Sequence, residues 1–398
     1  MLKLELKRIF SKKLNVLAVG LMVILAAVFS GFAATSNRYV DAHGTVSTGM
    51  LATRKLVENK NGYAGALTEA ELTKIVVQYK AVMAQSQEEQ DANYGTLYQP
   101  IDDILNFMIS VLTPDAGYDE TVLDSVTEDS VQDFYTWYRG NMKWMADQYG
   151  KTPEQKDYLE KKYSEIMLPL QYESYGAWDT MIMYAETYSI VLAILVGFIC
   201  AGIFADDFQT KADAVFFASK YGRSKAIKNK ILAGGVVATT MIYWTGIVLL
   251  SAISFGIMGT SGMHTPYQMS EAYSIYIMTY GQYYALTVAC GYIASLLAAS
   301  LAMLVAAKMH TISVAVCIPF FLYCLLPFIG RVLSSYTKVF NLIPTILTNV
   351  EASVRVPLLY QIGTHVIRQV PLVMVMYTVL SIVLLPLIYR SFRRYGRA

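Results

Sequence analysis

The chain of 398 residues is 55% hydrophobic and 16% charged, with a mean hydropathy of +0.39. Soluble proteins carry about 25% charged residues, so this composition excludes an ordinary soluble enzyme and indicates an integral membrane protein. Charge is unevenly placed, because residues 36–179 hold 12 Lys and Arg against 23 Asp and Glu, a net charge of −11, while the rest has a net charge of +13. A nucleic-acid partner needs a contiguous basic face for phosphate contacts and is therefore excluded.

The N-terminal residues 1–13 predict an amphipathic helix that lies in the membrane interface, with lysines on its polar face. Its apolar side chains at helical spacing are Leu2, Leu6, Ile9 and Phe10. Simple basic flanking residues are the alternative interpretation. Residues 14–34 then run without a charge and predict the first membrane-spanning helix. A cleaved signal peptide fits less well, since its apolar region usually has about 7–15 residues.

Residues 35–186 form a polar block that predicts a helical domain outside the membrane. Thr68 and Glu71 have the spacing of a capping box, and Thr152 followed by Pro153 is typical of a helix start. Further apolar helices are predicted over 101–112 and 131–149. All four cysteines lie outside the block, so it cannot contain a disulfide.

The same block combines aromatic residues with acidic charge, and two uses compete. Packing into a core is the first and the favoured one. The second is a collecting surface for a cationic amphipathic peptide, in which the aromatic rings stack on or enclose the ligand. The candidate ligand-contacting aromatics are Trp137, Trp144 and Trp178.

Five more uncharged runs follow within residues 187–390, which gives six transmembrane helices and an all-α integral membrane protein. They cover 188–205, 231–258, 283–307, 312–329 and 371–389. Lys and Arg gather before the first span, between the second and third, and in the tail 391–398. By the positive-inside rule both termini are cytoplasmic and residues 35–186 are extracellular, in a multi-pass protein of the cell membrane.

The segment 331–369 is long for a turn, moderately apolar and interrupted by Pro344 and Pro357. We expect short extracellular helices that dip into the outer leaflet, because backbone at that depth must be satisfied by protein or by a water-filled cavity. A simple surface loop is the alternative.

No motif in the sequence points to catalysis or to a cofactor. The chain lacks Gly-x-x-x-x-Gly-Lys-Ser/Thr and His-Glu-x-x-His, and its four histidines are scattered. The predicted spans carry no charge at their centres, whereas carriers driven by protons or ions usually do. The sequence therefore predicts no catalytic, cofactor-binding or metal site in this chain, and an energy source in a partner.

The joint between the second and third spans predicts a short helix at the membrane surface over residues 209–221. Four of its residues are expected on one face, and Gly222 is expected to end it in a left-handed conformation. A surface helix in that place can pass force from a partner to the spans. The candidate coupling residues are Asp206, Asp207, Thr210, Ala212, Val215, Phe216, Ser219, Tyr221, Gly222 and Arg223, and the expected face is Ala212, Val215, Phe216 and Ser219.

This stretch resembles the permease subunits of type-2 ABC exporters, in which an acidic and aromatic span end, a transverse coupling helix and a Gly-Arg followed by a Lys recur. The residues that carry the resemblance are Asp206, Asp207, Thr210, the helix up to Lys220, Tyr221, Gly222, Arg223 and Lys230. It extends to the six spans, the interfacial helix and the dip before the last span, and is closest to bacterial members with a large domain after the first span.

The resemblance implies an ATP-driven exporter of an amphipathic peptide, lipid-like or drug-like substrate. It implies two copies of a separate ABC ATPase subunit, which bring ATP and Mg, and a second permease that is identical or similar to this one. The alternative is a membrane sensor or immunity protein that binds a ligand through residues 35–186 without transporting it. An intramembrane enzyme ranks third, since no catalytic residues lie inside the spans.

Overall fold

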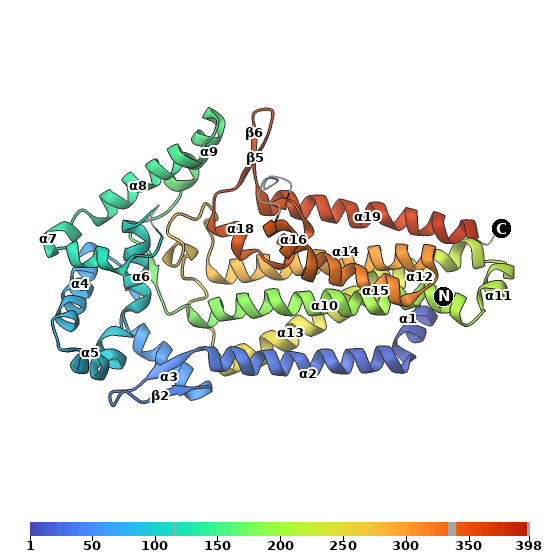
Figure 1. Cartoon of the computed structure of the whole chain (residues 1–398), viewed down its shortest axis with the longest axis horizontal. Coiled ribbons are helices and arrows are strands. Elements are labelled where there is room, and N and C mark those ends of the chain that lie inside the picture. Colours follow the sequence, from blue (N-terminus) through green and yellow to red (C-terminus); the bar gives the residue numbers. More distant parts are fainter. Residues whose placement is uncertain (115–116, 333–339, 396–398) are drawn as a thin grey trace.

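The computed structural model describes residues 1–114, 117–332 and 340–395. It is a long helical bundle with a smaller helical domain at one end (Figure 1). Six of the described helices are long and apolar enough to cross a membrane, which confirms the prediction of a multi-pass helical protein. They cover Lys13–Ser36, Gly176–Gln209, Gly222–Met258, Tyr280–Met309, Ile312–Ile329 and Gln369–Arg394.

The bundle has a buried centre and an exposed periphery. Its main helices are α2 (Lys13–Ser36), α10 (Gly176–Gln209), α13 (Thr239–Met258), α14 (Tyr280–Met309), α15 (Ile312–Phe320) and α19 (Gln369–Tyr395). Shorter pieces extend the third and fifth spans: η3 (Gly222–Ala226), α12 (Ile227–Leu232), η4 (Ala233–Ala238), η6 (Phe321–Leu325) and α16 (Leu326–Val332). α10 and α14 are mostly buried and pack along each other, whereas α2, α15 and α19 expose most of their apolar windows. These exposed apolar surfaces are suited to lipid.

A glycine allows three of these helices to approach closely. A Cβ built at Gly291 of α14 would lie 2.3 Å from Ser189 Oγ of α10 and 2.5 Å from the hydroxyl of Tyr243 on α13. The Tyr243 hydroxyl lies 3.3 Å from Ser189 Oγ and donates to the Val288 carbonyl at 2.7 Å. Small residues combined with interhelical hydrogen bonds are the usual means of packing helices within a membrane.

Residues 37–175, hereafter the polar domain, are mainly helical as predicted. The helices are α3 (Met50–Asn61), α4 (Glu69–Met83), α5 (Gln87–Asn93), η1 (Tyr94–Tyr98), α6 (Asp102–Leu112), η2 (Glu120–Ser125), α7 (Glu128–Val131), α8 (Phe134–Tyr149) and α9 (Pro153–Ser164). In the core, the Phe107 ring meets those of Phe134 and Tyr138 edge to face, with centroids 5.7 and 5.8 Å apart. Thr68 caps α4 and Thr152 caps α9 through their side-chain oxygens, which confirms both predicted helix starts.

The polar domain also contains two pairs of short strands. β1 (Arg38–Val40) pairs antiparallel with β2 (Val46–Thr48), and β3 (Gly65–Ala66) pairs antiparallel with β4 (Gln171–Tyr172), which joins the two ends of the domain. The helix predicted over 131–149 begins only at Phe134, because Thr127 and Ser130 form a capping box that makes α7 a separate turn.

α10 begins well before the uncharged run that predicted it, at Gly176 rather than Tyr188. The predicted domain boundary at residue 186 therefore falls inside a helix. Asp179 and Glu186 interrupted the apolar pattern, but Glu186 is accommodated because its Oε1 accepts hydrogen bonds from the backbone N–H groups of Val350 and Glu351 at 2.7 and 2.9 Å. One continuous helix consequently joins the polar domain to the bundle.

The segment predicted as dipping helices contains short helices and also a hairpin that the sequence did not predict. Its elements are η8 (Pro344–Thr348), α18 (Glu351–Arg355), β5 (Leu359–Ile362) and β6 (His365–Arg368). η8 is buried against α14 and α19, and the hairpin projects beside α9 (Figure 1). Residues 333–339 of this segment and 396–398 of the basic tail lie outside the described residues.

The N-terminal residues form a helix that is separate from the first span. α1 (Leu2–Ser11) ends at Lys12, whose backbone is extended, and α2 then starts in a new direction. Ile9 is buried, while Leu2, Leu6 and Phe10 pack partly against the bundle core. Figure 1 shows that α1, both termini and α11 (Asp213–Ala218) lie at the end of the bundle opposite the polar domain.

Candidate functional site

The predicted coupling segment is a compact reversal between two spans. α10 ends at Gln209, where the Thr210 hydroxyl donates to the Asp206 carbonyl at 2.7 Å, and Lys211 then adopts a left-handed backbone with φ of 57°. The short helix α11 follows. The prediction that Gly222 takes a left-handed conformation is wrong, because Gly222 starts the π-helical turn η3. Glycine is required there for another reason, since a Cβ would lie 1.8 Å from the Phe216 carbonyl oxygen.

The predicted single face of α11 is divided between two surfaces. Phe216 is half-buried and Phe217 buried, and both rings contact Phe392 of α19 with centroids 5.8 and 5.2 Å apart. Val215 is 76% exposed and Tyr221 is 48% exposed. The exposed side chains in and just after this helix are hereafter called the α11 surface. They are Val215, Lys220, Tyr221, Arg223 and Lys225. Ala212 and Ser219 of the predicted face are also exposed.

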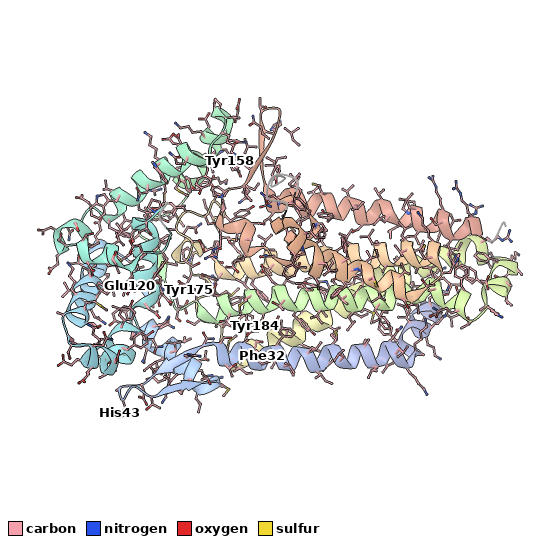
Figure 2. The ribbon with its side chains drawn as sticks, in the orientation of Figure 1. Phe32, His43, Glu120, Tyr158, Tyr175 and Tyr184 are labelled. Carbon is pink, nitrogen blue, oxygen red and sulfur yellow. The ribbon has the colours of Figure 1, made fainter. Side chains whose placement is uncertain are left out.

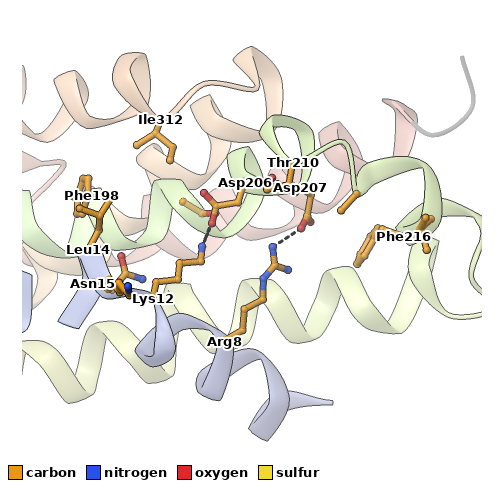
Figure 3. Close-up of a pocket in the computed structure, with 14 residues that line it drawn as sticks. Arg8, Lys12, Leu14, Asn15, Phe198, Asp206, Asp207, Thr210, Phe216 and Ile312 are labelled. Atoms are coloured by element: carbon orange, nitrogen blue, oxygen red, sulfur yellow. Dashed lines mark hydrogen bonds and ion pairs between the residues drawn. The ribbon is translucent and has the colours of Figure 1, made fainter. Parts of the chain in front are cut away.

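A buried ion cluster of Glu5, Arg8, Asp207 and Lys230 supports this segment from within. Lys230 is fully buried, and its Nζ lies 2.6 Å from Asp207 Oδ2 and 4.0 Å from Glu5 Oε2. The Lys230 ammonium also donates to the Ile203 carbonyl at 3.2 Å and lies 5.1 Å from the Phe216 ring centroid. Asp207 Oδ1 in turn accepts from Arg8 at 2.5 Å (Figure 3). The cluster therefore joins α1, α10 and α12 beneath α11.

A second ion pair joins the bend between α1 and α2 to the end of α10. Lys12 pairs with Asp206 (Figure 3), and the Asn15 side chain donates to the Ile9 carbonyl at 2.8 Å, which holds the bend. Burial, together with the nearby cations Arg8 and Lys230, lowers the pKa of Lys12 to about 8. The N-terminal helix is thus attached to the coupling segment at two points.

An open groove of about 830 Å³ lies beside these contacts. Its wall includes the ion pairs of Arg8 with Asp207 and of Lys12 with Asp206, together with side chains of the α11 region and the start of α15 (Figure 3). A second, almost wholly apolar groove of about 450 Å³ shares Leu14 and Phe198 with it. It runs between α2, α10 and α15. The two together form one surface that is charged at the end of the bundle and apolar along its side.

The three tryptophans predicted as ligand contacts occupy different environments. Trp178 is 6% exposed, donates its indole N–H to the Thr260 carbonyl at 3.1 Å and packs against Phe255. Trp137 and Trp144 are half-buried on α8, and Trp144 packs on the core of the polar domain. Core packing, the favoured use of aromatic residues, therefore accounts for Trp178.

Sequence reasoning missed the burial of Lys230 and its partnership with Asp207, although Lys230 was among the residues that carried the resemblance. The sequence offered one hint, which is that an acidic residue ends the second span and a basic residue precedes the third.

Within residues 1–114, 117–332 and 340–395, no group of three or more His, Cys, Asp or Glu side chains is placed to hold a metal ion. In comparisons with protein families, curated proteins and solved structures, the chain matches none of them.

Proposed function

We propose that this chain is the permease subunit of an ATP-driven exporter and that the α11 surface docks on a separate ATPase subunit. The observation that supports this is the exposure of Val215 on α11, whose inner side is firmly packed, and of Tyr221 in the turn that follows this helix. Exposed apolar and aromatic side chains ringed by polar residues are typical of protein interfaces. The resemblance to type-2 ABC permeases concerns the same residues.

The segment is suited to passing force from a partner to the membrane helices. α11 connects α10 directly to the third span through η3, and Phe216 and Phe217 contact Phe392 on the last span. The Lys230 ammonium under the Phe216 ring links the same helix to the buried ion cluster. Because packed cores transmit displacement rather than absorbing it, a push on the α11 surface reaches three spans together.

The orientation follows from charge. Lys220, Arg223 and Lys225 lie at the end of the bundle that carries both termini, so the positive-inside rule assigns this end to the cytoplasm. The protein then lies in the cell membrane with its polar domain outside the cell. ATP and Mg bind to the ATPase subunit. Two ATPase subunits assemble with two permeases, which are identical or similar to each other.

The combined groove supports an amphipathic substrate, whether peptide, lipid-like or drug-like. Its charged end is lined by Arg8 and Lys12 with their acidic partners, and its apolar end by aliphatic side chains such as Leu21 and Leu25. A molecule with a polar group and an apolar chain can contact both ends at once.

The test is co-purification of the tagged chain from its native host in mild detergent, followed by mass spectrometry and an ATPase assay. We expect a bound P-loop ATPase. Val215→Asp should lower its recovery about tenfold or more, because a buried charge replaces an apolar interface contact. Phe216→Asp and Arg223→Glu should also weaken recovery, but Val215→Asp is sharper since its side chain has little internal packing to lose.

The matched control is Met309→Asp. Met309 is 55% exposed at the end of α14, at the same end of the bundle but outside the α11 surface. Recovery of the ATPase should remain unchanged in this variant. A Val215→Asp variant that retains the ATPase would contradict the docking site, and a chain that is isolated without any ATPase in several detergents would favour the sensor or immunity protein instead.

A further inference from the structure

One carboxylate in the polar domain, that of Glu120, contacts one tyrosine and lies within the electrostatic range of three more. Glu120 starts η2 in the part of the domain far from the bundle (Figure 2). Tyr79 comes from α4, Tyr94 and Tyr98 from η1, and Tyr118 from the loop just before η2. Residues from three separate segments, α4, η1 and residues 118–120, thus meet at one place, which no sequence spacing indicates.

The contacts within this group are direct. The Tyr98 hydroxyl donates to Glu120 Oε1 at 2.5 Å, and the Tyr94 and Tyr98 rings stack with centroids 5.5 Å apart and planes at 20°. The Tyr79 ring lies 6.4 Å from that of Tyr98, and its hydroxyl donates to Asp124 at 3.4 Å. These contacts fix two ring faces beside a pair of carboxylates.

The carboxylate of Glu120 acts on every ring of the group. Burial raises the pKa of Tyr79, Tyr94, Tyr98 and Tyr118, and the negative charge of Glu120 raises each of them further. All four phenols therefore lie within the field of one acidic side chain. Glu120 forms no ion pair with any side chain of residues 1–114, 117–332 and 340–395, so no salt bridge within these residues neutralises its charge.

The group is open on one side. Tyr94 is 39% exposed and Tyr118 is 66% exposed, whereas Tyr79 is 3% exposed and forms the base. Large exposed aromatic rings beside an unpaired carboxylate, in a segment with a net charge of −11, attract positive charge both through the ring faces and through the Coulomb field.

We propose that Tyr94, Tyr98, Tyr118 and Glu120 bind the ammonium or guanidinium group of a lysine or arginine side chain presented by a cationic peptide. The rings enclose the cation and Glu120 supplies the opposite charge. A peptide is the occupant because the surrounding acidic surface can engage further basic residues along the same ligand. This proposal does not depend on the exporter function, since binding is measured on this chain alone.

The experiment uses the full chain in detergent micelles and a fluorescently labelled hexa-arginine amide, with binding followed by anisotropy. Tyr94→Ala with Tyr118→Ala should raise the Kd about tenfold or more, because each lost ring contact is worth a several-fold change in affinity. Both side chains are exposed, so the fold should survive. Tyr94→Phe with Tyr118→Phe keeps the rings and should leave the Kd within about twofold.

Two charge-removing variants distinguish binding at a defined site from general attraction to an acidic surface. Glu120→Gln keeps an acceptor for Tyr98 but removes the charge, and it should weaken binding about tenfold, as for charged contacts at interfaces. Glu160→Gln removes one exposed carboxylate on α9, the helix of Tyr158, which lies away from Glu120 (Figure 2), and should have little effect. Equal losses in the two variants would overturn the proposal in favour of diffuse attraction. Binding of tetramethylammonium without binding of the peptide would overturn the assignment of a peptide ligand.

Discussion

Replacing Asp207 with leucine should strongly destabilise the bundle, because it leaves the Lys230 ammonium buried without its nearest carboxylate. The Lys230 side chain has 0% exposure, and its remaining acidic neighbour, Glu5, lies 4.0 Å away. Removing one partner of a buried ion pair costs about 3–5 kcal/mol. With about 2–4 °C per kcal/mol for a bundle of this size, we expect the melting temperature to fall by roughly 6–20 °C.

Two further variants test whether the loss comes from an uncompensated charge. Asp207→Leu combined with Lys230→Met removes both buried charges and should recover most of the stability, because an apolar pair of similar volume is often neutral or stabilising. Arg8 is 38% exposed and can be solvated once Asp207 is gone. Asp206→Asn is the matched control, since Asp206 and Lys12 are 18% and 29% exposed, so water can solvate Lys12 in part and the loss of stability should be smaller than for Asp207→Leu.

The chain carries its own reporters for this assay. Cys200 and Cys290 are buried in the bundle, so a thiol-reactive dye labels them only as the bundle opens during a thermal ramp. Cys317 is exposed and Cys324 is half-buried, and the background labelling of these two thiols is removed by Cys317→Ser combined with Cys324→Ser. If the single and double variants lost equal stability, or if Asp206→Asn were as damaging as Asp207→Leu, the buried ion cluster would not be the energetic centre of this end of the bundle.

Three other changes have expected outcomes. Gly222→Ala should lower ATPase recovery because its Cβ collides with the Phe216 carbonyl, whereas Gly256→Ala, with nothing within 4 Å, should not. Glu186→Ala removes the acceptor at the start of α18 and should speed hydrogen exchange of its first amides, while Glu186→Gln should not. Burial raises the pKa of Tyr79 to about 12, so between about pH 10 and 12 the unfolded chain releases a proton that the folded chain keeps. Thermal stability should therefore fall as pH rises in this range, and Tyr79→Phe should lessen the slope.

The six spans could be predicted from the sequence because a bilayer requires each membrane-crossing helix to be an apolar stretch of nearly constant length. A run such as 14–34 has no charge and about the length that a bilayer requires, so no tertiary information is needed to recognise it. Helix starts at Thr68 and Thr152 were predictable for a similar reason, since capping is a contact between near neighbours in the chain.

Features that depend on distant partners could not be predicted. The start of α10 at Gly176 is hidden in the sequence by Glu186, whose charge is tolerated only because segment 350–351 donates to it. Gly222 is needed because the chain brings the Phe216 carbonyl close to it, and not because its own backbone is left-handed. The site around Glu120 combines four tyrosines from three separate segments, and the aromatic content of the sequence pointed to the tryptophans instead.

α10 is the element through which the two ends of the molecule can communicate. Its 34 residues span about 51 Å as a regular helix, from Gly176, which directly follows the polar domain, to the end at which Asp207 joins the buried ion cluster. It contains no proline, whereas the fifth and sixth spans contain Pro319 and Pro386 and the third and fifth are interrupted by π-helical turns. Prolines and π-turns are the usual sites of helix bending. Displacement of α11 should therefore move α10 as a rod and the polar domain with it, while the third, fifth and sixth spans can bend at their π-turns and prolines.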